Sequence, residues 1–184
     1  MPSIIGRGLN SERNLPGDEM KDEAKGLFLD RDGTLIEHIP YLHDPQEVRL
    51  VKGARNALSK VMDEGFRIFL FSNQSGVGRG MFTMNEVEAC NTRMVELLDI
   101  PGAIFTETCI APEKPGESAG YRKPNPRFIV EMIRKYDLNR RLCWMIGDSE
   151  CDVQAAGNAR IDHRLLNASL SLEEAIDDIL ISIK

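Results

Sequence analysis

The sequence predicts an α/β fold in which a parallel, doubly wound sheet lies between two layers of helices. Short apolar runs alternate with longer segments of helical spacing, which is the pattern of repeated β-α-β units. The 184 residues are enough for one domain with a substantial core, and 42% of them are hydrophobic. We therefore expect one Rossmann-like three-layer domain over residues 25–184. Residues 1–24 are polar without a sustained period and are expected to form a flexible tail.

Five short runs are the candidate strands. The first, second and fourth are nearly continuous in apolar residues, as expected of strands that are covered on both faces, whereas the third and fifth also contain polar residues. The runs are Gly26–Leu29, Phe66–Phe71, Ala103–Ile110, Leu142–Gly147 and Ile161–Leu166.

Segments with helical spacing lie between these runs. Thr83 followed by Glu86, and Ser171 followed by Glu174, predict capping boxes that begin two of the helices. The predicted helices are Val51–Glu64, one from Thr83 to about Leu98, Pro126–Tyr136 and one that follows Ser171.

Two carboxylates, Asp30 and Asp32, follow the first candidate strand. Strand alternation predicts that both lie on one side, with Arg31 pointing away, and Gly33 lets the chain turn sharply. Two acids at the end of a buried strand are costly unless a cation lies near them, and carboxylate oxygens suit Mg²⁺. One aspartate is then available as a nucleophile and the other as a general acid/base. Without further motifs, two aspartates at this spacing more often lie in a loop and are solvated.

A second polar cluster follows the second candidate strand, at Ser72, Asn73, Gln74 and Ser75. Hydroxyl groups and free backbone N–H groups at the end of a strand form a fitting cradle for phosphate oxygens. We therefore predict that these residues bind substrate, although the same letters alone are typical of an ordinary turn.

A third cluster places Lys123 just before a helix. Asn125 is the predicted N-cap and Pro126 the first helical residue, so Lys123 is expected to be anchored by a rigid loop. A fourth cluster places Asp148 after another strand and Asp152 one helical turn later. The simple alternative for the third cluster is a Lys-Pro pair on the surface. For the fourth cluster it is that Asp148 only caps a helix.

All four clusters would converge on one site, because ligands of open α/β sheets bind beyond the carboxyl ends of the strands. The order of acidic pair, hydroxyl, lysine and second acidic pair resembles the four motifs of the haloacid dehalogenase superfamily of phosphotransferases. The resemblance extends from about Gly26 to Asp152, which is most of the chain.

The motifs resemble most closely those of one subgroup, the D,D-heptose 1,7-bisphosphate phosphatases and the histidinol-phosphate phosphatase domains. The resemblance rests on Asp30–Thr34, Tyr41–His43, Ser72–Gly80 and Arg122–Pro124. It implies a small loop in place of a large cap domain, and only about twenty residues separate the first motif from the next helix, too few for an independent cap.

The resemblance also implies roles for the motif residues. Asp30 would be the nucleophile and Asp32 the general acid/base. Mg²⁺ would be held by Asp30, the backbone carbonyl of Asp32 and Asp148, with Asp152 orienting its outer shell. Ser72, the Asn73 N–H and Lys123 would bind the transferring phosphoryl group. The implied substrate-binding residues are Asn73, Gln74, Ser75, Arg122, His38 and Tyr41.

The chain departs from the subgroup at two places. Many relatives carry a zinc loop before the Arg-Lys-Pro motif, but here only Cys109 remains, and Ala111, Ala119 and Tyr121 stand where the other ligands would be. One thiolate does not make a tetrahedral zinc site, so no structural zinc is expected. Ser149 stands where heptose-bisphosphate phosphatases tend to carry lysine.

Charge and composition exclude several classes of partner. The net charge of −6 argues against general affinity for nucleic acid or anionic membranes. No apolar run approaches the roughly 20 residues that span a bilayer, and no secretory signal is visible. We therefore expect a cytoplasmic monomer whose partner is a small phosphorylated substrate.

Three functions remain open from the sequence. The first is a Mg²⁺-dependent phosphatase of heptose 1,7-bisphosphate, and the second a phosphatase of histidinol phosphate or another small monoester. The third is an inactive domain that binds phosphorylated ligands, which the presence of all four motif residues argues against. Removal of a 3′-phosphate from nucleic acid fits poorly with an acidic chain.

Overall fold

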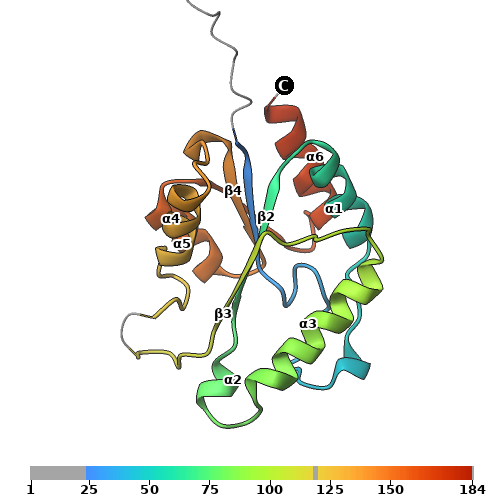
Figure 1. Ribbon diagram of the computed structural model, residues 1–184, viewed down its shortest axis with the longest axis vertical. Helices are drawn as coiled ribbons and strands as arrows, with labels where there is room; N and C mark the ends of the chain where they lie inside the picture. The colour runs from blue at the N-terminus through green and yellow to red at the C-terminus, as the bar shows by residue number, and fades with distance from the viewer. Residues whose placement is uncertain (1–23, 118–119, 184) are drawn as a thin grey trace, which may run out of the picture.

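The computed structural model describes residues 24–117 and 120–183, and in them five parallel strands form one sheet in the order β3-β2-β1-β4-β5. Helices cover both faces of this sheet (Figure 1). The predicted α/β fold is therefore confirmed, and the described residues contain no large cap domain. The strands are β1 (Gly26–Leu29), β2 (Arg67–Asn73), β3 (Glu107–Ala111), β4 (Cys143–Gly147) and β5 (Asp162–Leu165).

Two predictions concern residues outside the described part. The predicted tail, residues 1–24, lies outside it except for its last residue, so the boundary of the domain stays a prediction. Ala119, which replaces a zinc ligand of relatives, also lies outside the described residues.

Alternation along the central strands builds a core on each face of the sheet. Leu27 and Leu29 point to the face covered by α1, α3 and α6, whereas Phe28 points to the face covered by α4 and α5. Phe28 stacks on Phe69 at 4.7 Å between ring centroids and meets Phe128 of α4 edge-on. The helices are α1 (Ala54–Asp63), α3 (Met84–Leu98), α4 (Arg127–Lys135), α5 (Glu150–Ala159) and α6 (Leu172–Ser182).

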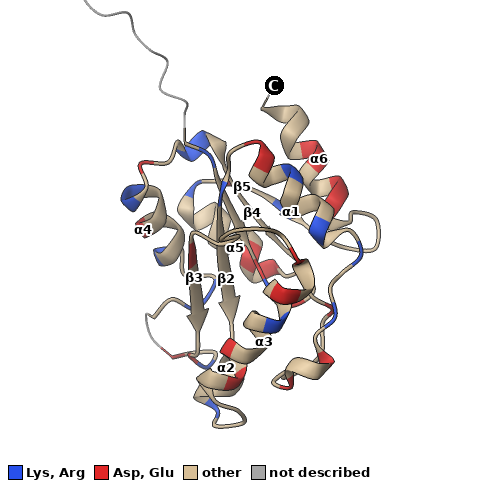
Figure 2. Cartoon of the chain, turned by 45° about the vertical axis from the view of Figure 1, so that its right-hand side comes forward, with Lys and Arg blue, Asp and Glu red and all other residues tan. Residues whose placement is uncertain are grey.

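Helices α1 and α6 lie side by side, and both carry charged residues (Figure 2). Lys60 of α1 forms ion pairs with Glu173 and Asp177 of α6, at 3.3 and 2.7 Å. These groups are 37–47% exposed, so solvent screens the pairs and they add little stability.

The ends of several elements differ from the predicted ones for local reasons. Helix α1 begins at Ala54 because Gly53, at φ +82°, makes the turn that precedes it. Strand β3 begins at Glu107, so the predicted residues 103–106 lie outside the strand. Both predicted capping boxes, at Thr83 and Ser171, are present. None of the helices in the described part is long and apolar enough to cross a bilayer.

Three short helices were not predicted. They are η1 (Pro45–Glu47), α2 (Ser75–Gly78) and η2 (Arg140–Leu142). The α2 turn requires a glycine at position 76, because a Cβ there would lie 2.1 Å from the ring of Phe82. This contact brings Phe82 close to the carboxyl end of β2.

Candidate active site

The predicted clusters meet at one pocket of about 270 Å³ beyond the carboxyl ends of β1, β2 and β4. Strand β1 lies between β2 and β4, at the point where the order of the strands reverses, which is where open α/β sheets bind ligands. The predicted site residues that line the pocket are Asp30, Asp32, His38, Tyr41, Asn73, Gln74, Ser75, Arg122, Lys123 and Asp148.

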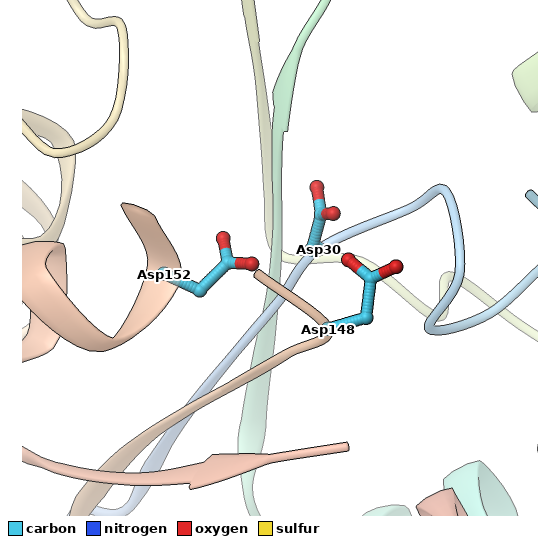
Figure 3. Close-up of side chains that lie close together, drawn as sticks. All are labelled: Asp30, Asp148 and Asp152. Carbon is cyan, nitrogen blue, oxygen red and sulfur yellow. The ribbon is translucent and has the colours of Figure 1, made fainter. Parts of the chain in front are cut away.

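Three aspartates converge beside this pocket (Figure 3). One carboxylate oxygen from each of Asp30, Asp148 and Asp152 lies within 4.8 Å of the others. Asp30 and Asp152 are buried, and Asp148 is the accessible one. Strand ends β1 and β4 supply the first two, and the first turn of α5 supplies Asp152. Three carboxylate oxygens at this spacing are a donor set that suits a hard divalent cation.

Lys123 is buried between two of these aspartates. Its ammonium lies 2.7 Å from Asp30 Oδ1 and 2.6 Å from Asp152 Oδ1, and the residue is 2% exposed. Burial opposes the charge on this lysine, but the two carboxylates outweigh burial and raise the pKa of Lys123 to about 12. The ammonium therefore carries a positive charge in the pocket. The predicted helix start is wrong by one residue: Pro126 is the N-cap and α4 begins at Arg127, whose N–H donates to Asn125 Oδ1.

Asp30 experiences the opposite balance. Burial raises the pKa of its carboxyl to about 7, Lys123 opposes this rise, and Asp152 adds to it. Burial first, and then Asp152, also raise the pKa of Asp148. The pocket thus holds more carboxylates than its buried cations, Lys123 and Arg31, neutralise. A divalent cation at the aspartate cluster would remove this imbalance, so the residues present fit Mg²⁺.

Asp152 has partners for both of its oxygens. Its Oδ1 pairs with Lys123, and its Oδ2 accepts hydrogen bonds from the backbone N–H and the hydroxyl of Ser149, at 3.1 and 2.7 Å. The latter two bonds form the capping box that begins α5. Ser149, which stands where relatives tend to carry lysine, therefore fixes the orientation of Asp152.

Asn73 holds the loop that carries Lys123. Its side-chain amide donates to the backbone carbonyl of Lys123 at 3.1 Å, and its carbonyl oxygen accepts the N–H of Lys123 at 2.9 Å. Because Asn73 ends β2, the position of Lys123 is set by the sheet. The backbone N–H of Asn73 was predicted to bind the phosphoryl group, and its side chain has this separate structural role.

The expectation that Arg31 points away from Asp32 was wrong. Its guanidinium donates to both oxygens of Asp32, at 3.1 Å from Nε and 3.0 Å from Nη2, and it lines the pocket. Strand β1 ends at Leu29, so the two-residue alternation does not continue through Asp30–Asp32. The signal that sequence reasoning missed was an arginine between two acids at the end of a buried strand, where a buried charge requires a partner.

Ser72 and Gln74 form a second contact with Asp32. The side-chain amide of Gln74 donates to Asp32 Oδ2 at 2.8 Å and to the hydroxyl of Ser72 at 2.9 Å. Ser72 is fully buried and does not line the pocket, whereas Gln74 does. The accepting Ser72 hydroxyl keeps its own hydrogen available for a further acceptor.

The open side of the pocket carries the residues predicted to contact the rest of the substrate. His38 and Tyr41 lie on the exposed loop after β1, and Tyr41 is 45% exposed. Arg122 uses Nη1 to donate to the backbone carbonyl of Glu113, which leaves its other N–H groups for a ligand. Phe82 also lines the pocket and was not predicted.

Among the described residues, the group of side chains that could hold a metal ion contains no cysteine. Cys109 is buried in β3, where burial raises the pKa of its thiol to about 12. Tyr121, at a position where relatives carry a zinc ligand, donates its hydroxyl to Glu131. Cys151 lines the pocket beside Ser149 and Asn73, and no pattern in the sequence predicted that position.

Gly33→Ala is expected to lower turnover about 10²-fold by displacing Asp148, because small misplacements in a site have effects of this size. A Cβ at Gly33 would lie 1.9 Å from Asp148 Oδ2, and the φ of +77° also disfavours alanine. Gly80→Ala is the matched control, since its φ is +70° and a Cβ there meets nothing within 4 Å. Steady-state kinetics and thermal unfolding of both variants test this. Equal losses of activity would show that backbone strain, and not the displaced aspartate, is responsible.

Comparisons with known proteins agree with this arrangement. A family model described as a haloacid dehalogenase-like hydrolase matches residues 41–160. A protein of Thermoplasma volcanium named probable D-glycero-D-manno-heptose-1,7-bisphosphate 7-phosphatase is 34% identical, over 77% of this chain and 98% of its own length. The histidine biosynthesis bifunctional protein HisB of Legionella pneumophila is 29% identical, over 75% of this chain and 40% of its own length.

The fold is shared with a solved structure. The D,D-heptose 1,7-bisphosphate phosphatase from B. bronchiseptica, complexed with magnesium and phosphate, superimposes with a TM-score of 0.73 at 23% identity. The match covers 86% of this chain and 99% of that one. The whole described domain, and not a fragment of it, therefore has this fold.

Proposed function

The chain belongs to the haloacid dehalogenase-like hydrolases, and from this premise we propose that it is a magnesium-dependent phosphatase of a small sugar phosphate. The proposed substrate is D-glycero-D-manno-heptose 1,7-bisphosphate, cleaved at its C7 phosphate. The observation that carries the proposal is the buried Asp30–Lys123 pair beside the aspartate cluster. Relatives that are named for this substrate support the choice of sugar.

Asp30 and Asp148 are the proposed metal ligands, together with the backbone carbonyl of Asp32. When bound, Mg²⁺ supplies positive charge that favours ionised Asp30 and screens its repulsion from the phosphate. Asp152 is buried and pairs with Lys123 and Ser149, which supports a role in orienting the outer shell of the metal.

Two steps transfer the phosphoryl group. Asp30 attacks phosphorus in line, and the P–O bond to the sugar breaks with its electron pair moving to the sugar oxygen. Asp32 gives that oxygen a proton. A water molecule then attacks phosphorus while Asp32, now a carboxylate, takes its proton. The bond between phosphorus and Asp30 breaks, which releases phosphate and restores the Asp30 carboxylate and the protonated Asp32.

Three groups are proposed to hold the phosphoryl group while it is transferred. Lys123 brings a permanent positive charge next to Asp30, and its burial strengthens the interaction. The hydroxyl of Ser72 and the backbone N–H of Asn73 are the proposed donors to phosphoryl oxygens. Each such preorganised donor is worth roughly 10²–10³ in turnover.

Arg122 is the proposed reader of the second phosphate, because a guanidinium can hold it with two parallel hydrogen bonds. His38 and Tyr41 would contact the sugar from the loop after β1, and Gln74 and Ser75 would complete the wall of the pocket. Histidinol phosphate is the alternative substrate, supported by the relatives that are named for histidine biosynthesis and by Ser149 in place of lysine.

The test is phosphate release from heptose 1,7-bisphosphate and from histidinol phosphate, each with Mg²⁺ and with EDTA. We expect a preference for the bisphosphate that disappears with EDTA. Arg122→Met should raise KM for the bisphosphate about 10- to 100-fold and change KM for a sugar monophosphate little. The control is Arg127→Met, which removes an exposed arginine of α4. A preference for histidinol phosphate would contradict the sugar assignment, and activity on neither ester would contradict the proposal.

A further inference from the structure

Arg31 is among the largest fully buried side chains of the described residues. Its guanidinium donates through Nε to Asp32 Oδ2 and through Nη2 to Asp32 Oδ1. The third nitrogen, Nη1, donates to Asn91 Oδ1 of α3 at 3.1 Å. A buried arginine is costly unless its charge is paired and its N–H groups are bonded, so these contacts hold both Arg31 and Asp32 in one arrangement.

The hydrogen bonds are shared unequally between the two oxygens of Asp32. Oδ2 accepts from Arg31 Nε and from Gln74, whereas Oδ1 accepts only from Arg31 Nη2. A carboxylate oxygen has two lone-pair sites in its plane. Oδ2 is therefore saturated by protein donors, and Oδ1 retains one site.

We infer that Arg31 and Gln74 are positioning residues that hold Asp32 so that its Oδ1 exchanges the proton in both steps of the reaction. Oδ1 gives its proton to the sugar oxygen as the P–O bond breaks, and the same atom takes a proton from the attacking water. This inference rests on the proposed function. It assigns to Arg31 a role through Asp32, and to Gln74 a role beside the contact with substrate that the sequence predicted.

The anchors of these two residues extend the arrangement beyond the pocket. Asn91 on α3 holds the far side of the guanidinium, and Ser72 at the end of β2 accepts from the amide of Gln74. Asp32 is thus fixed from a helix and from a strand at once. An aspartate on the turn after β1 would otherwise be free to rotate.

Arg31→Lys tests the inference, because lysine keeps the charge and loses the two parallel hydrogen bonds. The probes are a sugar phosphate, whose leaving oxygen requires a proton, and p-nitrophenyl phosphate, whose leaving group does not. We expect kcat on the sugar phosphate to fall about 10²-fold. The aryl ester should give a burst of nearly one nitrophenolate per enzyme, followed by slow turnover, since only the hydrolysis of the aspartyl-phosphate then needs Asp32.

Two other results would overturn the inference. A higher KM for both esters without a burst would mean that Arg31 contacts the substrate directly. Loss of the burst together with slow turnover would mean that the site as a whole is disturbed. Asn91→Ala, which removes only the anchor of the guanidinium, is expected to give the same burst with a smaller loss. Arg93→Lys, on the same helix and paired with Glu96, is the control.

Introducing Arg31→Lys into an Asp32→Asn background separates action through Asp32 from other effects. We expect no further loss of kcat in the double variant, because the carboxylate that Arg31 positions is already gone. An equal loss in both backgrounds would contradict the inference.

Thermal unfolding supplies a readout that does not depend on activity. The melting shifts of Arg31→Lys and Asp32→Asn should fail to add by about 3 °C or more in the double variant. If the wild-type protein hydrolysed no ester, the proposed function would fail, while additive melting shifts would separately overturn the contact between Arg31 and Asp32.

Discussion

Asp30→Asn is expected to abolish phosphate release from every ester that the protein hydrolyses, with kcat lower by roughly 10⁵-fold or more. The amide keeps the size of the carboxylate but is not a nucleophile toward phosphorus, so the first step of the reaction has no attacking group. The measurement is phosphate release at saturating substrate and Mg²⁺. Asp99→Asn is the control, because Asp99 is an exposed aspartate that pairs with Arg55 and does not line the pocket. Residual turnover within about 10²-fold of wild type would remove Asp30 as the nucleophile.

Asp30→Asn is also expected to change how the stability of the protein depends on pH. Because burial raises the pKa of Asp30 from 3.8 to about 7, the folded protein holds a proton that the unfolded chain releases between these values. The wild-type protein therefore loses stability as pH rises through this window, and the asparagine variant does not. In metal-free protein, the Tm of the variant minus the Tm of the wild type should therefore increase by roughly 5 °C from pH 4 to pH 8. A Tm difference that stays constant across this range would contradict the raised pKa.

Lys123→Met is expected to be the most destabilising of these substitutions. It leaves the carboxylates of Asp30 and Asp152 buried without their common cation, and breaking such a pair costs about 3–5 kcal/mol, or roughly 10 °C in Tm. Turnover should fall on the order of 10²–10³-fold because the charge on the phosphoryl group is no longer neutralised. Excess Mg²⁺ should recover part of the lost stability, since it brings positive charge to the same aspartates.

Lys60→Met is the matched control for this experiment. Lys60 also pairs with two carboxylates, but its side chain is 39% exposed where that of Lys123 is 1% exposed. Its loss should therefore shift Tm by about 2 °C or less and leave turnover unchanged. Similar shifts for the two lysines would show that burial of Lys123 does not carry the energy assigned to it.

The sequence predicted the residues of the site better than their contacts. Asp30, Lys123 and Asp148 could be located because each follows a strand or precedes a helix, and parallel strands bring such ends to one edge. The helix starts at Thr83 and Ser171 were equally predictable, because a capping box is a local signal.

The contacts that were not predicted arise where regular structure ends. The direction of Arg31 was wrong because alternation holds only within a strand, and β1 ends two residues earlier. The bonds from Gln74 to Asp32 and from Asn73 to Lys123 join residues 42 and 50 positions apart. Which donor meets which acceptor across such distances depends on the folded backbone, and no spacing in the sequence expresses it.

The two hydrogen bonds between Asn73 and the backbone of Lys123 bear on how relatives diverge. They fix the lysine to the end of β2, so the segment that precedes it in the chain can change in length and composition without moving the Lys123 ammonium. Arg122, His38 and Tyr41 line the same pocket. Members of one family can therefore differ in the loops around the pocket while this lysine keeps its place, which fits a group whose members are named for a sugar phosphate and for histidine biosynthesis at similar identity to this chain.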